Sequence, residues 1–211
     1  MLENRALVQR MGQIIIQAQR GADIEIKSRF LEDEKAISCL VDQARTLGLT
    51  VVLTQGVFDL VHIGHARYAR EAKRSGHLLI VGLDDDEKAR ERKGENRPVV
   101  PFIERWEMLC HLRYVDAVAM KKATDPKWHL IKLVRPDILI AVDGTYCSEE
   151  ITELEKICGK VEVLKRQANT STSAKVRTLV LDGAETLTRT LVQRLPEFVH
   201  DIYQEIKKEG A

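Results

Sequence analysis

Long apolar runs are absent from the sequence, and so is an excess of charge of either sign. The cluster Ile14-Ile15-Ile16 near the N-terminus is bracketed by polar residues, whereas a membrane-spanning helix needs about 20 apolar residues. Lysine and arginine number 33 against 32 acidic residues, so no global field favours nucleic acid or a membrane surface. We therefore expect no signal peptide, no membrane span and no nucleic-acid partner.

Cysteines are few and scattered, and two common nucleotide-binding motifs are missing. The four cysteines form no CxxC pair and no metal-site spacing with histidine; they are Cys39, Cys110, Cys147 and Cys158. Unpaired thiols of this kind are typical of a cytoplasmic protein. No GxGxxG follows the first apolar strand and no GxxxxGK followed by Ser or Thr occurs, which disfavours a Rossmann dehydrogenase and a P-loop enzyme.

The apolar periodicity from residue 50 onward predicts strands alternating with helices. Strands are expected at 50–55, 78–83, 115–119, 137–142 and 160–164, and helices at 64–75, 102–113, 126–134, 148–158 and 172–180. This alternation predicts an α/β fold, a Rossmann-like, doubly wound five-stranded parallel sheet. Amphipathic helices are expected over 1–20 and 31–47, and a helical tail follows the sheet. The expected organisation is a helical extension (1–48), a catalytic domain (49–180) and a helical C-terminal tail (181–211).

Two histidines occupy the corner between the first of these strands and its helix. The strand ends in Thr54-Gln55-Gly56, and the helix begins near His62-Ile63-Gly64-His65. A spacing of three residues puts the two imidazoles on one helix face, and the free N–H groups of a helix N-terminus attract anions. The corner therefore predicts a phosphate site. A metal site is the alternative, but a third ligand at sensible spacing is lacking.

The segment His62-Ile63-Gly64-His65, supported upstream by Gly56, Phe58 and Asp59, resembles the HxGH signature of the nucleotidylyltransferase superfamily, the cytidylyltransferase-like group. The resemblance implies transfer of a nucleoside monophosphate from a nucleoside triphosphate to a phosphorylated partner. It makes His62 and His65 catalytic donors to the α- and β-phosphates. The residues around them become nucleotide contacts, namely Thr54, Gly56, Phe58 and Gly64. For Asp59 a helix-capping role is at least as well supported.

A basic loop after the second predicted strand carries a further resemblance. The segment Arg92 to Pro101 is similar to the KGxxRPVxP segment of the adenylyltransferases that activate heptose 1-phosphate. The resemblance makes Lys93 a catalytic contact to triphosphate oxygens and Arg105, in the following helix, a nucleotide contact. The competing interpretations are a solvated loop lysine and a salt-bridged surface arginine.

Two more segments match the family in order along the chain. Arg113-Tyr114-Val115-Asp116 resembles its RYVD element, which implies a fold and homodimer role. The segment 166–173 resembles RTxGISTS and makes Arg166, Ser171 and Thr172 candidates for binding the β- and γ-phosphates, beside ordinary helix capping. Asp143, after the fourth strand, is the remaining candidate nucleotide contact.

Departures from the family pattern leave the substrates open. Val142 stands at a position that is basic in the heptose-phosphate enzymes, Thr145 stands where an acidic residue is expected, and Gln55 replaces a usual Asn or Thr. ATP is slightly favoured over CTP, the acceptor is a sugar phosphate or phosphorylated alcohol, and the resemblance implies Mg²⁺ on the triphosphate. A non-catalytic nucleotide-binding scaffold or sensor is the alternative function.

Overall fold

The computed structural model describes residues 2–20, 26–165, 180–181, 183–196 and 198–199. The chain divides into two compact units, residues 1–169 and 170–211, and each is treated by itself. In the second unit, the described residues between 180 and 199 are helical. The helical tail expected there is present over those residues.

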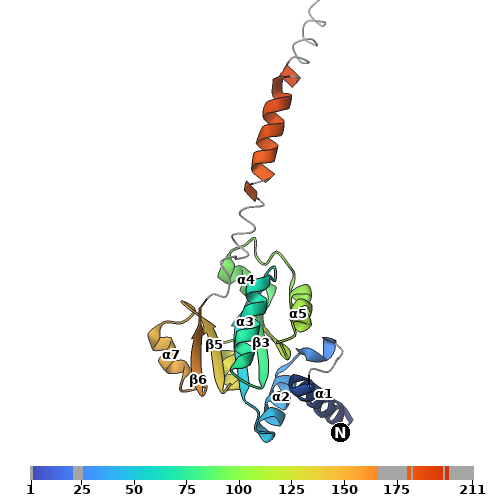
Figure 1. The fold of residues 1–211 in the computed structure, drawn as a ribbon, viewed down its shortest axis with the longest axis vertical. Coiled ribbons are helices and arrows are strands. Elements are labelled where there is room, and N and C mark those ends of the chain that lie inside the picture. Colours follow the sequence, from blue (N-terminus) through green and yellow to red (C-terminus); the bar gives the residue numbers. More distant parts are fainter. Residues whose placement is uncertain (1, 21–25, 166–179, 182, 197, 200–211) are drawn as a thin grey trace, which may run out of the picture. The chain divides into compact units, whose positions relative to one another are not determined.

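The first unit is built on a parallel sheet in the order β1-β4-β3-β2-β5-β6 (Figure 1). Its strands are β1 (Phe30–Leu31), β2 (Val51–Gly56), β3 (Leu78–Asp84), β4 (Ala117–Lys121), β5 (Ile138–Val142) and β6 (Lys160–Leu164). The helices are α1 (Leu2–Arg20), α2 (Glu34–Thr46), α3 (Ile63–Arg74), α4 (Asp86–Lys93), α5 (Phe102–His111), α6 (His129–Val134) and α7 (Ser148–Leu154), with a 3-10 turn η1 (Ile26–Arg29).

The five expected strands are present, and the prediction of a five-stranded sheet is wrong by one edge strand. The additional strand, β1, is only two residues long and pairs with β4, which is too short to show a period in the sequence. It also takes Leu31 out of the helix predicted for 31–47. That helix begins at Glu34 because the Asp33 side chain accepts the N–H of Ala36 as an N-cap.

Helix α4 is the second element that differs from the expectation, because residues 92–101 were expected to form one loop. Its residues are polar almost throughout and give no apolar stripe. Asp85 caps it by accepting the N–H of Lys88, and acidic residues in its first turn face basic residues in its last, which complements the helix dipole. Lys93 is consequently the last residue of a helix.

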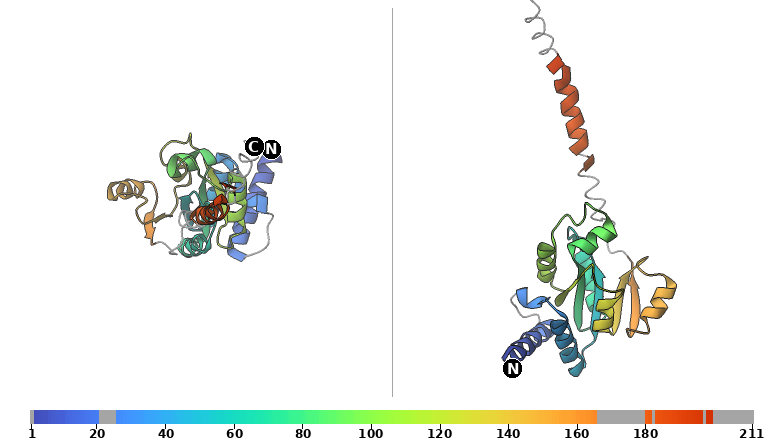
Figure 2. Two further views of the ribbon diagram at one scale, coloured as in Figure 1. Left: turned by 90° about the horizontal axis from the view of Figure 1, so that it is seen from above. Right: turned by 180° about the vertical axis from the view of Figure 1, so that it is seen from behind.

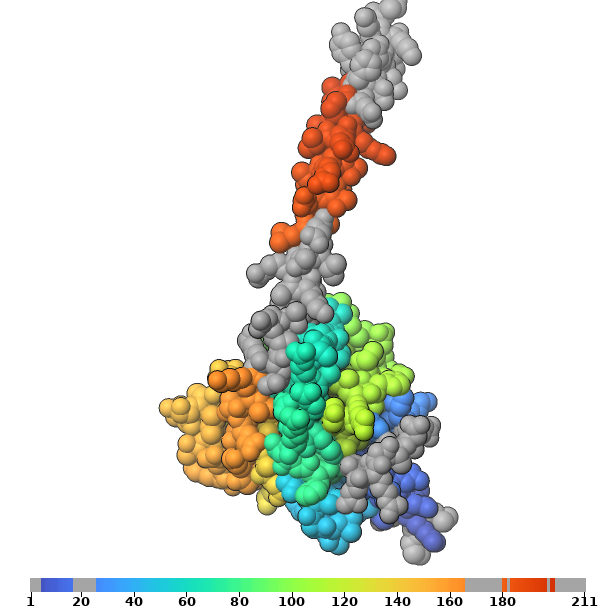
Figure 3. Space-filling model, in the orientation of Figure 1, coloured from blue at the N-terminus to red at the C-terminus, as the bar shows by residue number. Residues whose placement is uncertain are grey.

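Helices cover both faces of the sheet, so its central strands are buried on both sides. One apolar core joins the sheet to α1, α2 and α6, and the other joins it to α3 and α5. Figures 1 and 3 show α3 exposed on its own face, and the view from behind in Figure 2 shows α1 beside α2. No described helix is long and apolar enough to cross a bilayer.

The topology places a ligand crevice at the carboxyl end of β2. From β2 the chain builds β3 and β4 on one side, and then crosses over to add β5 and β6 on the other. In open parallel sheets, ligands bind where the strand order reverses. The segment Gly56 to His65 leaves the sheet at this switch point, as the sequence predicts.

Asp116 ties the far end of α3 to the sheet. Its carboxylate, 8% exposed, accepts hydrogen bonds from Lys73 Nζ at 2.5 Å and from the N–H of Leu79 at 2.6 Å. The expectation that the RYVD element serves the fold is thereby confirmed for Asp116. Its proposed place at a dimer interface stays a prediction.

We expect Asp116→Ala to lower the free energy of unfolding by about 3–5 kcal/mol, because it leaves the Lys73 ammonium without its carboxylate and a strand N–H without an acceptor. Urea denaturation measures the change. Glu71→Ala is the matched control, since Glu71 pairs with Arg70 and Arg74 at the surface and its loss should leave stability unchanged. Equal effects of the two substitutions would contradict this role of Asp116.

Candidate active site

The corner between β2 and α3 is held in a strained backbone conformation. Phe58 and Leu60 have φ angles of 48° and 47°, a left-handed geometry that costs free energy in residues other than glycine. The turn between them aims Asp59 inward, with 6% of its surface exposed. Such strain persists only where the surrounding structure enforces it, so contacts with the rest of the fold hold the corner in this conformation.

His62 and His65 cap α3 by a reciprocal pair of hydrogen bonds. The N–H of Gly64 donates to His62 Nδ1 at 3.1 Å, and the N–H of His62 donates to His65 Nδ1 at 3.3 Å. A nitrogen that accepts a hydrogen bond carries no proton, so these contacts assign the ring protons to Nε2. Both imidazoles therefore carry their N–H donor on Nε2, the nitrogen that these capping hydrogen bonds do not engage.

The two rings also keep His65 uncharged. Their centroids are 4.0 Å apart. Burial, with the neighbouring His62 acting in the same direction and Asp59 opposing it, lowers the pKa of His65 to about 4. His65 is thus a neutral hydrogen-bond donor at neutral pH. Desolvation is the dominant cause, so this imidazole does not change its charge near neutral pH as an exposed histidine does.

The small and apolar residues of the motif shape the same corner. Phe58 is 7% exposed and its ring centroid lies 5.4 Å from that of His65. A Cβ at Gly56 would lie 3.0 Å from the Phe58 ring, so glycine is needed there for close packing. Gly64 is buried in the first turn of α3 and supplies the N–H that fixes His62. The structure brings these three predicted residues together around the histidines.

Asp59 joins this corner to the loop that follows α4. Its carboxylate accepts from Arg97 Nη1 at 2.7 Å and from the N–H groups of Val99 and Val100 at 3.1 and 3.0 Å. These hydrogen bonds lower the pKa of Asp59, although burial acts the other way as the largest single influence. The suggestion that Asp59 caps α3 is wrong, because His62 occupies the cap position.

Arg105 and Thr54 lie beneath the crevice, each about 1% exposed. The Arg105 guanidinium donates to the carbonyls of Val57, Asp84 and Val100 at 2.6–2.9 Å and to Asp86 Oδ1 at 2.6 Å. Thr54 Oγ1 lies 2.6 Å from the Tyr68 hydroxyl and donates to the carbonyl of Ile140. Both side chains are engaged by protein groups, and their predicted nucleotide contacts stay predictions. Arg105 is also no surface arginine: it binds three loops together.

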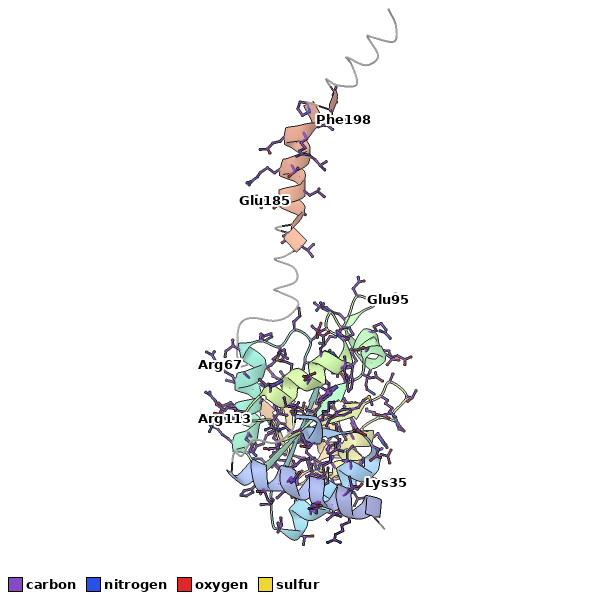
Figure 4. All side chains as sticks on the ribbon, turned by 90° about the vertical axis from the view of Figure 1, so that its right-hand side faces the viewer. Lys35, Arg67, Glu95, Arg113, Glu185 and Phe198 are labelled. Carbon is purple, nitrogen blue, oxygen red and sulfur yellow. The ribbon has the colours of Figure 1, made fainter. Side chains whose placement is uncertain are left out.

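The remaining predicted contacts lie on other elements or outside the described residues. Lys93 is the last residue of α4 and Asp143 directly follows β5, the strand that pairs with β2, and both are exposed. In Figure 4, Glu95, in the loop after α4, and Arg67, near the start of α3, both lie on the outside of the unit. Arg166, Ser171 and Thr172 fall outside the described residues, so their roles stay predictions.

Sequence reasoning missed a buried ion cluster at the carboxyl edge. Asp84, 0% exposed at the end of β3, pairs with Lys121 Nζ at 2.8 Å and with Arg92. Burial lowers the pKa of Lys121, while Asp84 opposes that shift. The run Asp84-Asp85-Asp86 after an apolar strand was the available signal, since carboxylates at a strand end need partners.

The Asp59 carboxylate at the corner already accepts hydrogen bonds from protein groups. Among the described residues, no group of three or more His, Cys, Asp or Glu side chains is placed to hold a metal ion. The interpretation of His62 and His65 as metal ligands therefore gains no third ligand, and both Nδ1 atoms are already engaged by backbone N–H groups.

Comparison with known proteins gives concordant matches. A family model described as cytidylyltransferase-like matches residues 53–199. The bifunctional protein HldE of Coxiella burnetii (strain Dugway 5J108-111) is 38% identical over 150 residues, which are 70% of this chain and 31% of that protein. The bifunctional protein HldE of a Nitratiruptor species is 31% identical over 150 residues, 70% of this chain and 32% of that protein. The chain thus spans about a third of the length of these relatives.

A solved structure agrees with the fold. The pantoate-beta-alanine ligase from Francisella tularensis superposes with a TM-score of 0.51 at 14% identity, covering 68% of both chains. Identity at this level supports the fold alone, a Rossmann-like α/β arrangement around a parallel sheet.

The low pKa of His65 predicts how stability depends on pH. In the unfolded chain a histidine takes up its proton near pH 6.5, but in the folded protein His65 does so only near pH 4. The unfolded state therefore binds more protons between these values, and stability falls as the pH falls from about 6.5 to about 4. Glutamine at this helix position keeps the capping hydrogen bond without a titrating group.

We expect the stability difference between the wild type and His65→Gln to change by on the order of 1–3 kcal/mol over that pH range, in favour of the variant at low pH. Urea unfolding at several pH values measures it. A constant difference between pH 7 and pH 4 would show that His65 titrates normally.

The three contacts of Asp59 predict that Asp59→Asn loosens the loop that carries Arg97. Losing the charge should destabilise the protein by about 1–3 kcal/mol and speed amide hydrogen exchange at Val99 and Val100. Asp42→Asn, at an exposed position of α2, is the matched control. Unchanged exchange at both amides in Asp59→Asn would refute the link.

Proposed function

Because the chain belongs to the cytidylyltransferase-like family, we propose that it transfers a nucleoside monophosphate from a nucleoside triphosphate to a sugar phosphate or phosphorylated alcohol and releases pyrophosphate. The observation that supports the proposal is the reciprocal capping of α3, which leaves His62 and His65, just after the end of β2, with their ring protons on Nε2. ATP is favoured slightly over CTP, on the similarity of residues 92–101 to adenylyltransferases.

The proposed reaction is an in-line displacement at the α-phosphorus. A phosphate oxygen of the acceptor forms the new P–O bond, and the bond from the α-phosphorus to the α–β bridging oxygen breaks, so that pyrophosphate leaves with the electron pair. Such a reaction needs no covalent nucleophile and is catalysed by positioning and by stabilising charge. His62 and His65 would donate hydrogen bonds to α- and β-phosphate oxygens as negative charge moves onto the leaving group.

The neutrality of His65 suits this role. A neutral imidazole donates one hydrogen bond from Nε2 and has no charge to be solvated inside a partly buried corner. The dipole of α3 adds a positive electrostatic potential at its N-terminus without requiring protonation. Catalysis by His65 should therefore persist down to pH values near 5, well below the ordinary pKa of histidine.

The remaining contacts are proposals that follow the family pattern. Lys93 would reach the triphosphate from the end of α4, and Arg166, Ser171 and Thr172 would hold the β- and γ-phosphates. Because the described carboxylates form no metal cluster, Mg²⁺ would be bound by triphosphate oxygens and water. Arg105 and Thr54 act in this scheme as positioning residues that hold the loops of the corner. A homodimer in the cytoplasm completes the proposal.

A pyrophosphate-release assay with ATP and CTP, against a panel of sugar phosphates and glycerol 3-phosphate, tests the function. We expect turnover with one nucleotide, and a loss of about 10²–10³-fold in kcat for His65→Ala, the cost of removing one preorganised donor. His111→Ala, at an exposed position of α5, should match the wild type.

Nucleotide binding without pyrophosphate release from any acceptor would favour the non-catalytic scaffold. A folded His65→Ala variant as active as the wild type would remove His65 from the mechanism. Stoichiometric zinc in the purified protein would support the alternative of histidine metal ligands.

A further inference from the structure

A second hollow at the carboxyl edge of the sheet lies on the opposite face from α3. Its volume is about 220 Å³, and its walls come from the ends of β2 and β4, from α4, and from the segments before α6 and α7. The side chains used below are Gln55, Arg92, Lys121, Trp128, Thr145 and Tyr146. This volume is below the roughly 300–1,000 Å³ of pockets for drug-sized ligands, so it suits one small polar molecule.

Gln55 presents an unused donor to this pocket. Successive side chains of a strand point to opposite faces, so Thr54 faces α3 and Gln55 faces the pocket. Gln55 Nε2 is buried and has no hydrogen-bond partner among the described residues. Because an unpaired buried amide costs free energy, a ligand oxygen at this place would be stabilising.

The side chains of Lys121 and Gln55 both pack over Gly82, which has no side chain of its own to fill the space between them. A Cβ at Gly82 would lie 2.6 Å from Leu130 Cδ2, 3.0 Å from Lys121 Cδ and 3.1 Å from Gln55 Cγ, so a larger residue would crowd all three side chains. Glycine at this position thus leaves room for the Gln55 amide and the Lys121 side chain to lie next to each other.

The cationic side of the pocket is only partly neutralised. Lys121 and Arg92 share one buried carboxylate, that of Asp84. Two positive charges against one negative leave a net positive charge beside the pocket, which favours an anion. An ammonium and a guanidinium are the groups that proteins commonly use for phosphate.

Aromatic rings line the other wall. Lys127 Nζ lies 4.4 Å from the centroid of Trp128, and Tyr146 follows the end of β5. Tyr146 lines the same pocket as Trp128. Gln55 directly precedes Gly56, so the pocket adjoins the end of β2 from which the segment carrying His62 and His65 departs.

We propose that this pocket binds the acceptor as a monosaccharide phosphate, with the Gln55 amide donating to the acceptor and Lys121 neutralising its phosphate. The inference rests on the proposed nucleotidyl transfer and names its acceptor site. A sugar ring supplies oxygens for Gln55 and C–H faces for the aromatic wall, which a short phosphorylated alcohol supplies less fully. Val142 stands at a position that is basic in the heptose-phosphate enzymes and supplies no charge here. Lys121 supplies a positive charge to the pocket instead, beside Thr145 and Tyr146.

Steady-state kinetics separate acceptor binding from nucleotide binding. With the acceptor found in the pyrophosphate assay, Gln55→Leu should raise its KM about 5- to 10-fold and Lys121→Met by at least about 10-fold. The nucleotide KM should change less than about 2-fold. Matched controls are Gln43→Leu on α2 and Lys122→Met, whose side chain follows Lys121 and is absent from this pocket.

The same kinetics test the acceptor class. Pentose, hexose or heptose 1-phosphates should give kcat/KM values at least about 10-fold above that of glycerol 3-phosphate. A preference for glycerol 3-phosphate, or an unchanged acceptor KM in both pocket variants with turnover intact, would overturn the inference and leave the proposed function standing.

Direct binding distinguishes failure of the pocket from failure of the reaction. The chain has two tryptophans, and Trp106 is buried in the core on the α3 face, so Trp128 reports on the pocket. Titration of the full chain with the same sugar phosphates, without nucleotide, should give a saturable change in fluorescence. Trp128→Phe should abolish the change and Gln55→Leu should weaken it.

Saturable binding without pyrophosphate release would support the pocket and overturn the proposed function. A fluorescence response that persists in Trp128→Phe, or that Gln55→Leu leaves unaltered, would overturn the pocket. Circular dichroism and thermal unfolding of each variant establish that the fold is retained.

Discussion

The reciprocal hydrogen bonds between His62 and His65 are the constraint on which the candidate site depends. They satisfy two backbone N–H groups at the start of α3. Because both Nδ1 atoms accept these hydrogen bonds, both ring protons lie on Nε2. Capping and donor orientation are therefore one interaction.

The surroundings of the histidines keep that arrangement fixed. Asp59 ties the strained turn to the loop after α4, and Arg105 binds the carbonyls of Val57, Asp84 and Val100. Both are charged groups with almost no solvent exposure, so their satisfied hydrogen bonds hold the loops more firmly than surface pairs could. Substituting either should disturb the corner without touching a substrate.

Sequence patterns predicted the elements with strong periodicity and missed those without it. The parallel strands, α3 and α5 follow from apolar runs and helical spacing, and the motif order places His62 and His65 at the switch point. β1 is too short for a period, and α4 is polar throughout, although its Asp85 cap was visible. Arg105 shows a different limit: a charged residue in an amphipathic helix gives no sign of burial until the loops that it binds are folded.

The central claim is that two imidazoles with protons fixed on Nε2 bind a triphosphate. Long-range ¹H–¹⁵N spectra at pH 7, with and without a non-hydrolysable ATP or CTP analogue, test it most directly. The account predicts that Nε2 is the protonated nitrogen of His65, that Nδ1 of both rings accepts its backbone hydrogen bond, and that the Nε2 resonances of both shift on adding analogue. An Nδ1–H tautomer at His65, or resonances that do not respond to the analogue, would contradict it.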